Sequence, residues 1–139
     1  MKSLTFLFVL FLSIQVFAQS TEADAEVQTG PTITFEEKSH NFGEINQGEK
    51  VQYDFVYKNT GSEPLIISNV RTSCGCTAPN WSKEPLPVGE SATLKIVFNS
   101  AGKRGMQNKI ITITSNATNN PERVKITGNV IYTTPAASQ

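Results

Sequence analysis

The stretch that decides the fold runs Val51-Gln52-Tyr53-Asp54-Phe55-Val56-Tyr57-Lys58. Its large apolar residues occupy alternate positions, and the positions between them are mainly polar. Side chains of a β-strand point alternately to opposite faces, so this pattern predicts a strand with one face buried and the other exposed to solvent. The apolar face consists of Val51, Tyr53, Phe55 and Tyr57.

Other β-like runs lie on both sides of this strand, separated by turn signals such as Asn59-Thr60-Gly61-Ser62. The runs are Thr32–Phe35, His40–Ile45, Leu65–Arg71, Ala92–Phe98, Asn108–Ser115 and Val124–Tyr132. No window shows a helical apolar period. About seven short strands predict an all-β fold, an Ig-like sandwich of two antiparallel sheets. A small closed barrel is the alternative.

The chain divides into four segments. Residues 1–18 carry Lys2, an apolar run from Leu4 to Leu12, and small residues at the −3 and −1 positions of a cleavage site, Val16 and Ala18, which predicts a secretory signal peptide. An uncleaved anchor is the alternative, but a spanning helix needs about 20 apolar residues. Residues 19–30 predict a flexible spacer, residues 31–132 the sandwich domain, and residues 133–139 a disordered tail.

Export and charge limit the functions that fit. Removal of residues 1–18 leaves 11 basic and 12 acidic residues, because Lys2 is lost. This balance favours neither nucleic acid nor an anionic membrane surface, and no later run could span a bilayer. We therefore expect a periplasmic or extracellular protein that has no membrane span after signal cleavage.

Cys74 and Cys76 are the two cysteines of the chain, separated by Gly75. In an extended backbone their Cα atoms would lie about 6.5–7 Å apart, at or beyond the usual limit of about 6.8 Å for a disulfide. Gly75 allows a tighter turn, so a bridge is feasible. We expect a structural pair, reduced or bridged. A redox-active pair and a Cu(I) site, with Met106 as a helper, are the alternatives.

Other residues offer little chemistry. His40 is the single histidine, and it precedes a predicted strand, where a surface role is more typical than a catalytic one. Glu36 and Glu37 are adjacent on an expected strand, so they would face opposite ways and could not act as a pair. We expect no enzyme activity, no cofactor and no resident metal site.

A binding surface is the remaining hypothesis. Arg71, Thr77 and Trp81 surround the cysteines and form a candidate binding loop. Trp81 would either fold back as a lid on the sandwich or project as a contact residue. Exposed sheet edges are a second candidate, because they can accept an added strand.

Several short motifs resemble a known family. They are Asn41-Phe42-Gly43-Glu44-Ile45, Gly48-Glu49, Lys58-Asn59-Thr60-Gly61, Pro64-Leu65-Ile66-Ile67, Ser73-Cys74-Gly75-Cys76-Thr77, Arg104-Gly105, Ser115-Asn116 and Ile126-Thr127-Gly128-Asn129-Val130. Together they resemble the bacterial secreted family called domain of unknown function 1573. One departure is Val88, inserted where the family usually has a Pro-Gly-Glu turn.

The resemblance implies an Ig-like fold related to major-sperm-protein-type sandwiches and adds no activity. We expect an exported, non-enzymatic module that binds or helps assemble an envelope protein whose identity the sequence does not reveal. The alternative is a thiol redox or copper-handling protein that uses Cys74 and Cys76.

Overall fold

Strand β3 (Lys50–Asn59) contains the decisive stretch and pairs antiparallel with β6 (Ser91–Asn99) along almost its whole length. Phe55 and Tyr57 are buried, whereas Asp54 and Lys58 are exposed. The alternation along β6 is the same, since Leu94, Ile96 and Phe98 are buried. The inward faces predicted for both strands are therefore confirmed.

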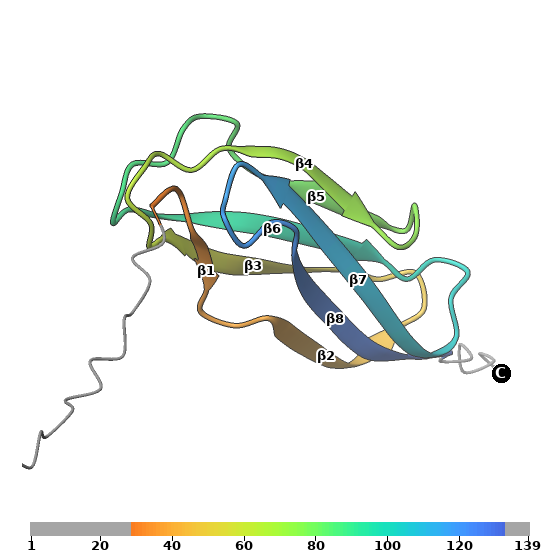
Figure 1. Ribbon diagram of the computed structural model, residues 1–139. Coiled ribbons are helices and arrows are strands. Elements are labelled where there is room, and N and C mark those ends of the chain that lie inside the picture. The colour runs from red at the N-terminus through yellow and green to blue at the C-terminus, as the bar shows by residue number, and fades with distance from the viewer. Residues whose placement is uncertain (1–28, 133–139) are drawn as a thin grey trace, which may run out of the picture.

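The structure, a computed structural model, describes residues 29–132, which form two four-stranded sheets packed face to face (Figure 1). The first sheet has the order β1-β3-β6-β5, and the second has the order β2-β8-β7-β4. The remaining strands are β1 (Ile33–Phe35), β2 (Ser39–Asn46), β4 (Ile67–Thr72), β5 (Thr77–Asn80), β7 (Gly105–Ser115) and β8 (Glu122–Ile131). The predicted all-β sandwich is thus confirmed.

Two details differ from the expectation. The described residues contain eight strands, because the short β5 follows the cysteines. This strand has four residues and includes Pro79, so its sequence lacks a strand-like pattern. The sheets are also not purely antiparallel, since β2 pairs in parallel with β8. The chain crosses from the first sheet to the second after β1, and β2 then runs beside β8 in the same direction.

The core lies between the sheets and includes Phe55, Phe98, Ile111 and Ile126. Two glycines of the quoted motifs are required by close packing. A Cβ on Gly61 would overlap backbone atoms of Gly30 and Thr32, and a Cβ on Gly128 would lie 2.7 Å from Cδ1 of Ile45. These motif residues therefore hold the N-terminal strands against the sandwich.

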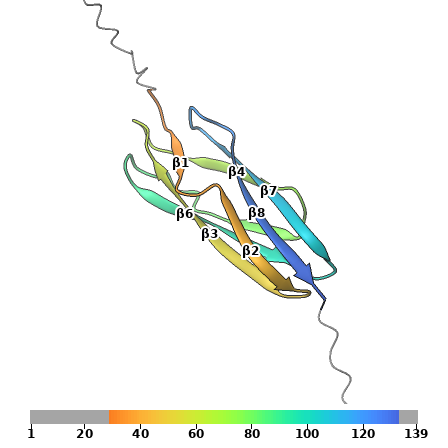
Figure 2. The ribbon, with the colours of Figure 1, turned by 90° about the horizontal axis from the view of Figure 1, so that it is seen from below.

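Strand β1 is much shorter than its neighbour β3. It pairs only with Tyr57, Lys58 and Asn59, so the first half of β3 has no partner strand on that side. Strand β2 runs alongside this half of β3 but belongs to the opposite sheet (Figure 2). The crossover between β1 and β2 thus leaves one edge of the first sheet partly open.

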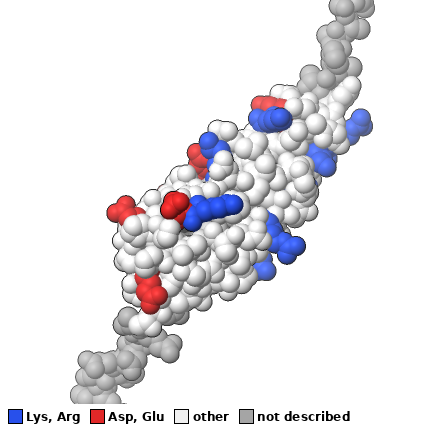
Figure 3. Space-filling model, turned by 90° about the horizontal axis from the view of Figure 1, so that it is seen from above, with Lys and Arg blue, Asp and Glu red and all other residues white. Residues whose placement is uncertain are grey.

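The signal peptide, most of the spacer and the tail were predicted in residues 1–28 and 133–139, which lie outside the described residues. Within residues 29–132 there is no helix of a length and apolarity that could cross a membrane. The face in Figure 3 carries Lys, Arg, Asp and Glu side chains on a largely uncharged surface.

Candidate functional site

The cysteines lie in a tight turn between β4 and β5, where the chain passes from the second sheet to the first. Cys74 and Cys76 form a disulfide, and their Cα atoms are 5.3 Å apart. Residues 74–76 are therefore not extended as in the geometry considered above, because the chain folds into a turn at Gly75 and Cys76. The sequence left open whether the two cysteines are reduced or bridged, and in the structure they are bridged.

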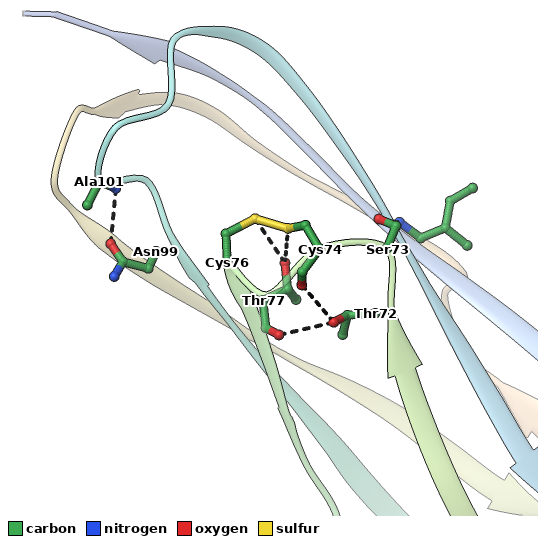
Figure 4. Close-up of a disulfide and its surroundings, with 8 residues drawn as sticks. Thr72, Ser73, Cys74, Cys76, Thr77, Asn99 and Ala101 are labelled. Carbon is green, nitrogen blue, oxygen red and sulfur yellow. Dashed lines mark hydrogen bonds between the residues drawn. A yellow bond between two sulfur atoms is a disulfide. The ribbon is translucent and has the colours of Figure 1, made fainter.

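Hydrogen bonds hold this turn independently of the disulfide (Figure 4). The Thr72 hydroxyl donates to the carbonyl oxygen of Cys74 at 2.8 Å and also lies 3.2 Å from that of Thr77. On one side Ser73 bonds β7, as its N–H donates to the carbonyl oxygen of Ile110 at 3.0 Å. On the other side the Asn99 N–H donates to the carbonyl oxygen of Cys76 at 2.9 Å. The turn is thus bound to both sheets.

Thr77 is almost fully buried beside the disulfide. Its side chain is only 4% exposed, and its hydroxyl oxygen lies 3.6 Å from Sγ of Cys74 and 4.0 Å from Sγ of Cys76. Figure 4 shows the hydroxyl facing both sulfurs. Thr77, a member of the candidate binding loop, therefore turns toward the disulfide and does not present its side chain to a partner.

Arg71 and Trp81 occupy separate places. Arg71 is exposed on the outer face of the second sheet and lines a shallow depression with Ser73 and Ile110. Trp81 is half-buried against the core, and its Nε1 donates to the carbonyl oxygen of Ile67 at 3.3 Å. The lid alternative for Trp81 is thus the observed one, and the three loop residues do not form one surface.

The other residues considered for chemistry, His40, Glu36 and Glu37, lie in β2 and in the segment before it. His40 lies within β2 rather than before a strand, and its ring stacks on that of Tyr53 with centroids 3.7 Å apart. Glu36 and Glu37 follow β1 instead of lying on a strand. Among residues 29–132, no three His, Cys, Asp or Glu side chains lie close enough together to hold a metal ion.

Glu37 has a clear structural partner. The Tyr53 hydroxyl donates to a carboxylate oxygen of Glu37 at 3.0 Å. This hydrogen bond raises the pKa of Tyr53, because the phenol donates the proton that the carboxylate accepts, and the negative charge disfavours a phenolate. Burial likewise raises the pKa of Tyr57. Neither shift places a titrating group near neutral pH.

Two sheet edges are closed by specific contacts. At β1, the side chain of Asn119 replaces a neighbouring strand: it accepts from the N–H of Ile33 at 3.2 Å and donates to the carbonyl oxygen of Ile33 at 2.8 Å. At β5, Pro79 has no N–H to offer, and both backbone polar groups of Thr77 are bonded within the turn. Such features block the addition of a further strand.

The edges of the second sheet are also modified. The pairing of β2 is interrupted between Asn41 and Glu44, and that of β4 between Ile67 and Asn69. Irregularities of this kind twist an edge away from an approaching strand. On β4 the carbonyl oxygen of Ile67 is also occupied, by the indole of Trp81.

The first half of β3 lacks such protection. The N–H of Asn59 donates to the carbonyl oxygen of Glu90, next to β6, so the backbone groups of Asn59 face β6. The carbonyl oxygen of Val56 accepts from the N–H of Glu36, just after β1, so the backbone groups of Val56 face away from β6. Backbone groups alternate in direction along an antiparallel strand, so those of Gln52 and Asp54 point away from β6, toward the position that β1 does not fill. The sequence predicted exposed sheet edges as a candidate binding surface but not which edge is open, since that depends on where β1 ends.

Aromatic side chains line the seam between this open edge and β2. The rings of His40 and Phe42 meet edge to face with centroids 4.7 Å apart, and those of Tyr53 and Phe55 do so at 4.8 Å. Phe55 is buried, whereas His40, Phe42 and Tyr53 are half-buried. The open edge therefore lies beside apolar ring surface that remains partly accessible.

Solved structures with this fold come from proteins of several kinds. A protein of unknown function from Porphyromonas gingivalis W83 is 17% identical, with a TM-score of 0.65 over 75% of this chain and 49% of its own. This chain therefore spans about half the length of that protein. PapD-like domain 7 of human CEP192 is 12% identical, with a TM-score of 0.61 over 74% of this chain and 87% of the domain.

The VesB protease of Vibrio cholerae is 17% identical, with a TM-score of 0.58, and the match covers 71% of this chain but only 32% of VesB. At these identities the similarity shows the sandwich fold alone. No relative was found among curated proteins.

A family model also matches the sequence, over residues 33–130. The matched region begins with β1 and ends in β8, so it covers the whole sandwich, including the disulfide turn and the open edge of β3. The chain belongs to the family described as protein of unknown function (DUF1573).

Proposed function

We propose that this protein is an exported, non-enzymatic module that binds an extended segment of another envelope protein and helps in its assembly. The fold supports a binding role, since the similar structures include a PapD-like domain. The disulfide supports export, because such bonds persist in oxidising compartments. The resemblance to a bacterial secreted family supports an envelope location.

The open edge of β3 is the observation that carries this proposal. From Lys50 to Phe55 no described strand pairs with β3 on the side away from β6. Each outward-facing residue there offers one N–H and one C=O, and a partner strand satisfies both by extending the sheet. The other edges carry contacts or irregularities that hinder such pairing, so we assign the partner to β3.

The seam beside this edge indicates the chemistry of the partner. A strand paired with Gln52 and Asp54 would direct alternate side chains toward Phe42, His40 and Tyr53. Aromatic and β-branched side chains pack well against such rings. The partner segment should therefore be extended, free of proline, and apolar or aromatic at alternate positions.

Export itself has a direct test. We expect signal cleavage after Ala18, so the intact mass of the native protein should correspond to a chain that begins at Gln19. The measurement is mass spectrometry of the protein recovered from the envelope fraction and from the medium. A protein that keeps Met1 and remains in the membrane fraction would contradict the proposed location.

Binding is tested by removing one outward N–H. Gln52→Pro should weaken binding at least about tenfold, because proline cannot donate to the partner strand and its ring obstructs pairing. The fold should persist, since proline is tolerated where a strand N–H faces solvent. Partners crosslinked to the wild type in the native envelope are identified, purified and titrated against each variant.

Gln52→Ala is the matched control, as it changes the same side chain and keeps the N–H; it should bind like the wild type. Equal affinity of Gln52→Pro and Gln52→Ala would exclude the β3 edge. Loss of binding in Trp81→Ala alone would show that the partner binds at the loop after β5 instead of at the β3 edge. A dimer of the purified chain that Gln52→Pro dissociates would identify the occupant as a second copy.

A further inference from the structure

We propose that the Cys74–Cys76 disulfide is a thiol–disulfide exchange site, reduced by the dithiol of a partner protein. This inference goes beyond the strand-binding function and does not depend on it. It rests on three features of the turn: Gly75, the hydroxyl of Thr77, and the hydrogen bonds that hold the turn to both sheets.

Neither a positive φ nor close packing against other parts of the fold requires glycine at position 75. All nine glycines of the chain lie in the described residues, and six of them have positive φ angles. Gly61 and Gly128 are required by close packing. A Cβ on Gly75 would have no atom within 4 Å apart from atoms of Cys74 and Cys76, and the φ of Gly75 is not in the left-handed region. Gly75 is exposed, so a side chain at this position would add bulk on the solvent side of the turn, between the two cysteines.

The Thr77 hydroxyl is a buried donor directed at the sulfurs. A disulfide sulfur is a weak acceptor, whereas a thiolate carries a full charge and forms a much stronger hydrogen bond. The contacts at 3.6 Å and 4.0 Å therefore gain strength when the disulfide opens. Such a donor stabilises the thiolate and the transition state that leads to it.

The turn should survive reduction. The bonds from Thr72, Ser73 and Asn99 hold its backbone without any contribution from the sulfurs. With a single residue between the cysteines, the cross-link closes a very short loop, and short loops constrain the unfolded chain little. The domain can then change its redox state while it remains folded.

Exchange would begin at Cys74, because Cys76 packs against the hydrophobic core. A partner thiolate attacks Sγ of Cys74, the S–S bond breaks, and its electron pair passes to Sγ of Cys76, where Thr77 donates to the new thiolate. The partner's second thiolate then attacks the mixed disulfide at the partner's sulfur and releases Cys74. The partner is oxidised to a disulfide, and Cys74 and Cys76 take up its two protons as thiols.

The test compares reduction rates of the purified, oxidised protein at one pH. Thr77→Val should be reduced by dithiothreitol about tenfold more slowly than the wild type, because a hydrogen bond to a charged group is lost. Thr77→Ser keeps the hydroxyl and should restore most of the rate. The readout is mass spectrometry after alkylation, with circular dichroism to show that each variant is folded.

Gly75→Leu tests access separately. A Cβ at position 75 meets no atom within 4 Å outside the two cysteines, so the fold should persist. Reduction by a thioredoxin-type dithiol protein should slow at least about tenfold, because the bulky side chain blocks in-line approach. Reduction of this variant by dithiothreitol, which is small, should change much less.

The proposal is overturned if Thr77→Val is reduced as fast as the wild type, or if reduction unfolds the domain. It is also overturned if Gly75→Leu reacts with the dithiol protein at the wild-type rate. Stoichiometric Cu(I) binding by the reduced chain, lost in Cys74→Ser/Cys76→Ser, together with no reaction with the dithiol protein, would assign the pair to metal handling instead.

Discussion

Phe55→Ala and Phe98→Ala should each lower the free energy of unfolding by about 3–5 kcal/mol, measured by chemical denaturation. Both side chains are 1% exposed and lie in the core between the sheets. Their removal loses the transfer free energy of the ring and leaves a cavity that the two sheets cannot fill. A domain of this size has a total stability of about 5–15 kcal/mol, so either variant approaches loss of the fold.

The matched controls are Lys58→Ala and Lys95→Ala, on the same two strands. Lys58 is exposed and Lys95 is half-exposed, so each change should stay within about 0.5 kcal/mol. Losses at the lysines as large as those at the phenylalanines would mean that the inward face is assigned wrongly.

The second large effect is expected at Asn59, whose side chain is 0% exposed. Its Nδ2 donates to the carbonyl oxygens of Glu63 at 2.8 Å and Leu86 at 3.0 Å, and its Oδ1 accepts from the N–H of Gly61 at 3.1 Å. Asn59→Ala leaves the carbonyl oxygen of Glu63 and the N–H of Gly61 without partners at a place that water scarcely reaches, whereas the Leu86 carbonyl keeps its bond from the N–H of Leu65. Since each unpaired group costs about 1–3 kcal/mol, the loss should be about 2–6 kcal/mol.

Asn69→Ala is the control for Asn59→Ala, because Asn69 is an exposed asparagine on a strand. Its effect on the midpoint of denaturation should be small. If Asn59→Ala costs less than about 1 kcal/mol, water must replace the amide, and the loops around Glu63 and Leu86 are then looser than their hydrogen bonds suggest.

Asn59 also changes how the quoted motifs are understood. Asn59 and Gly61 hold the segment before β1 and the loop before β6, and Gly128 makes room for Ile45. These motif residues therefore have packing and hydrogen-bonding roles in the fold. The Cys-Gly-Cys-Thr turn differs, since Gly75 has no such role and Thr77 faces the sulfurs.

Local alternation was sufficient to predict the fold class. A strand that is half buried must alternate apolar and polar residues, so the runs of β3 and β6 identify their inward faces without any knowledge of their partners. The cysteine turn could also be located, as it follows an apolar run. Short β5 was missed because its four residues, Pro79 among them, carry no periodic signal.

The features that bear most on function depend on contacts between residues far apart in the chain. Asn119 closes the β1 edge through Ile33, and Trp81 folds back onto Ile67, pairings that no local pattern encodes. The crossover after β1 leaves the first half of β3 without a partner strand, and the turn places the Thr77 hydroxyl next to both sulfurs. The sequence by itself determined an all-β fold of half-buried strands and favoured a sandwich over a small barrel, because burial of one strand face is a local property. Only the tertiary structure decided which edges stay open and what surrounds the disulfide, because those depend on how the layers meet.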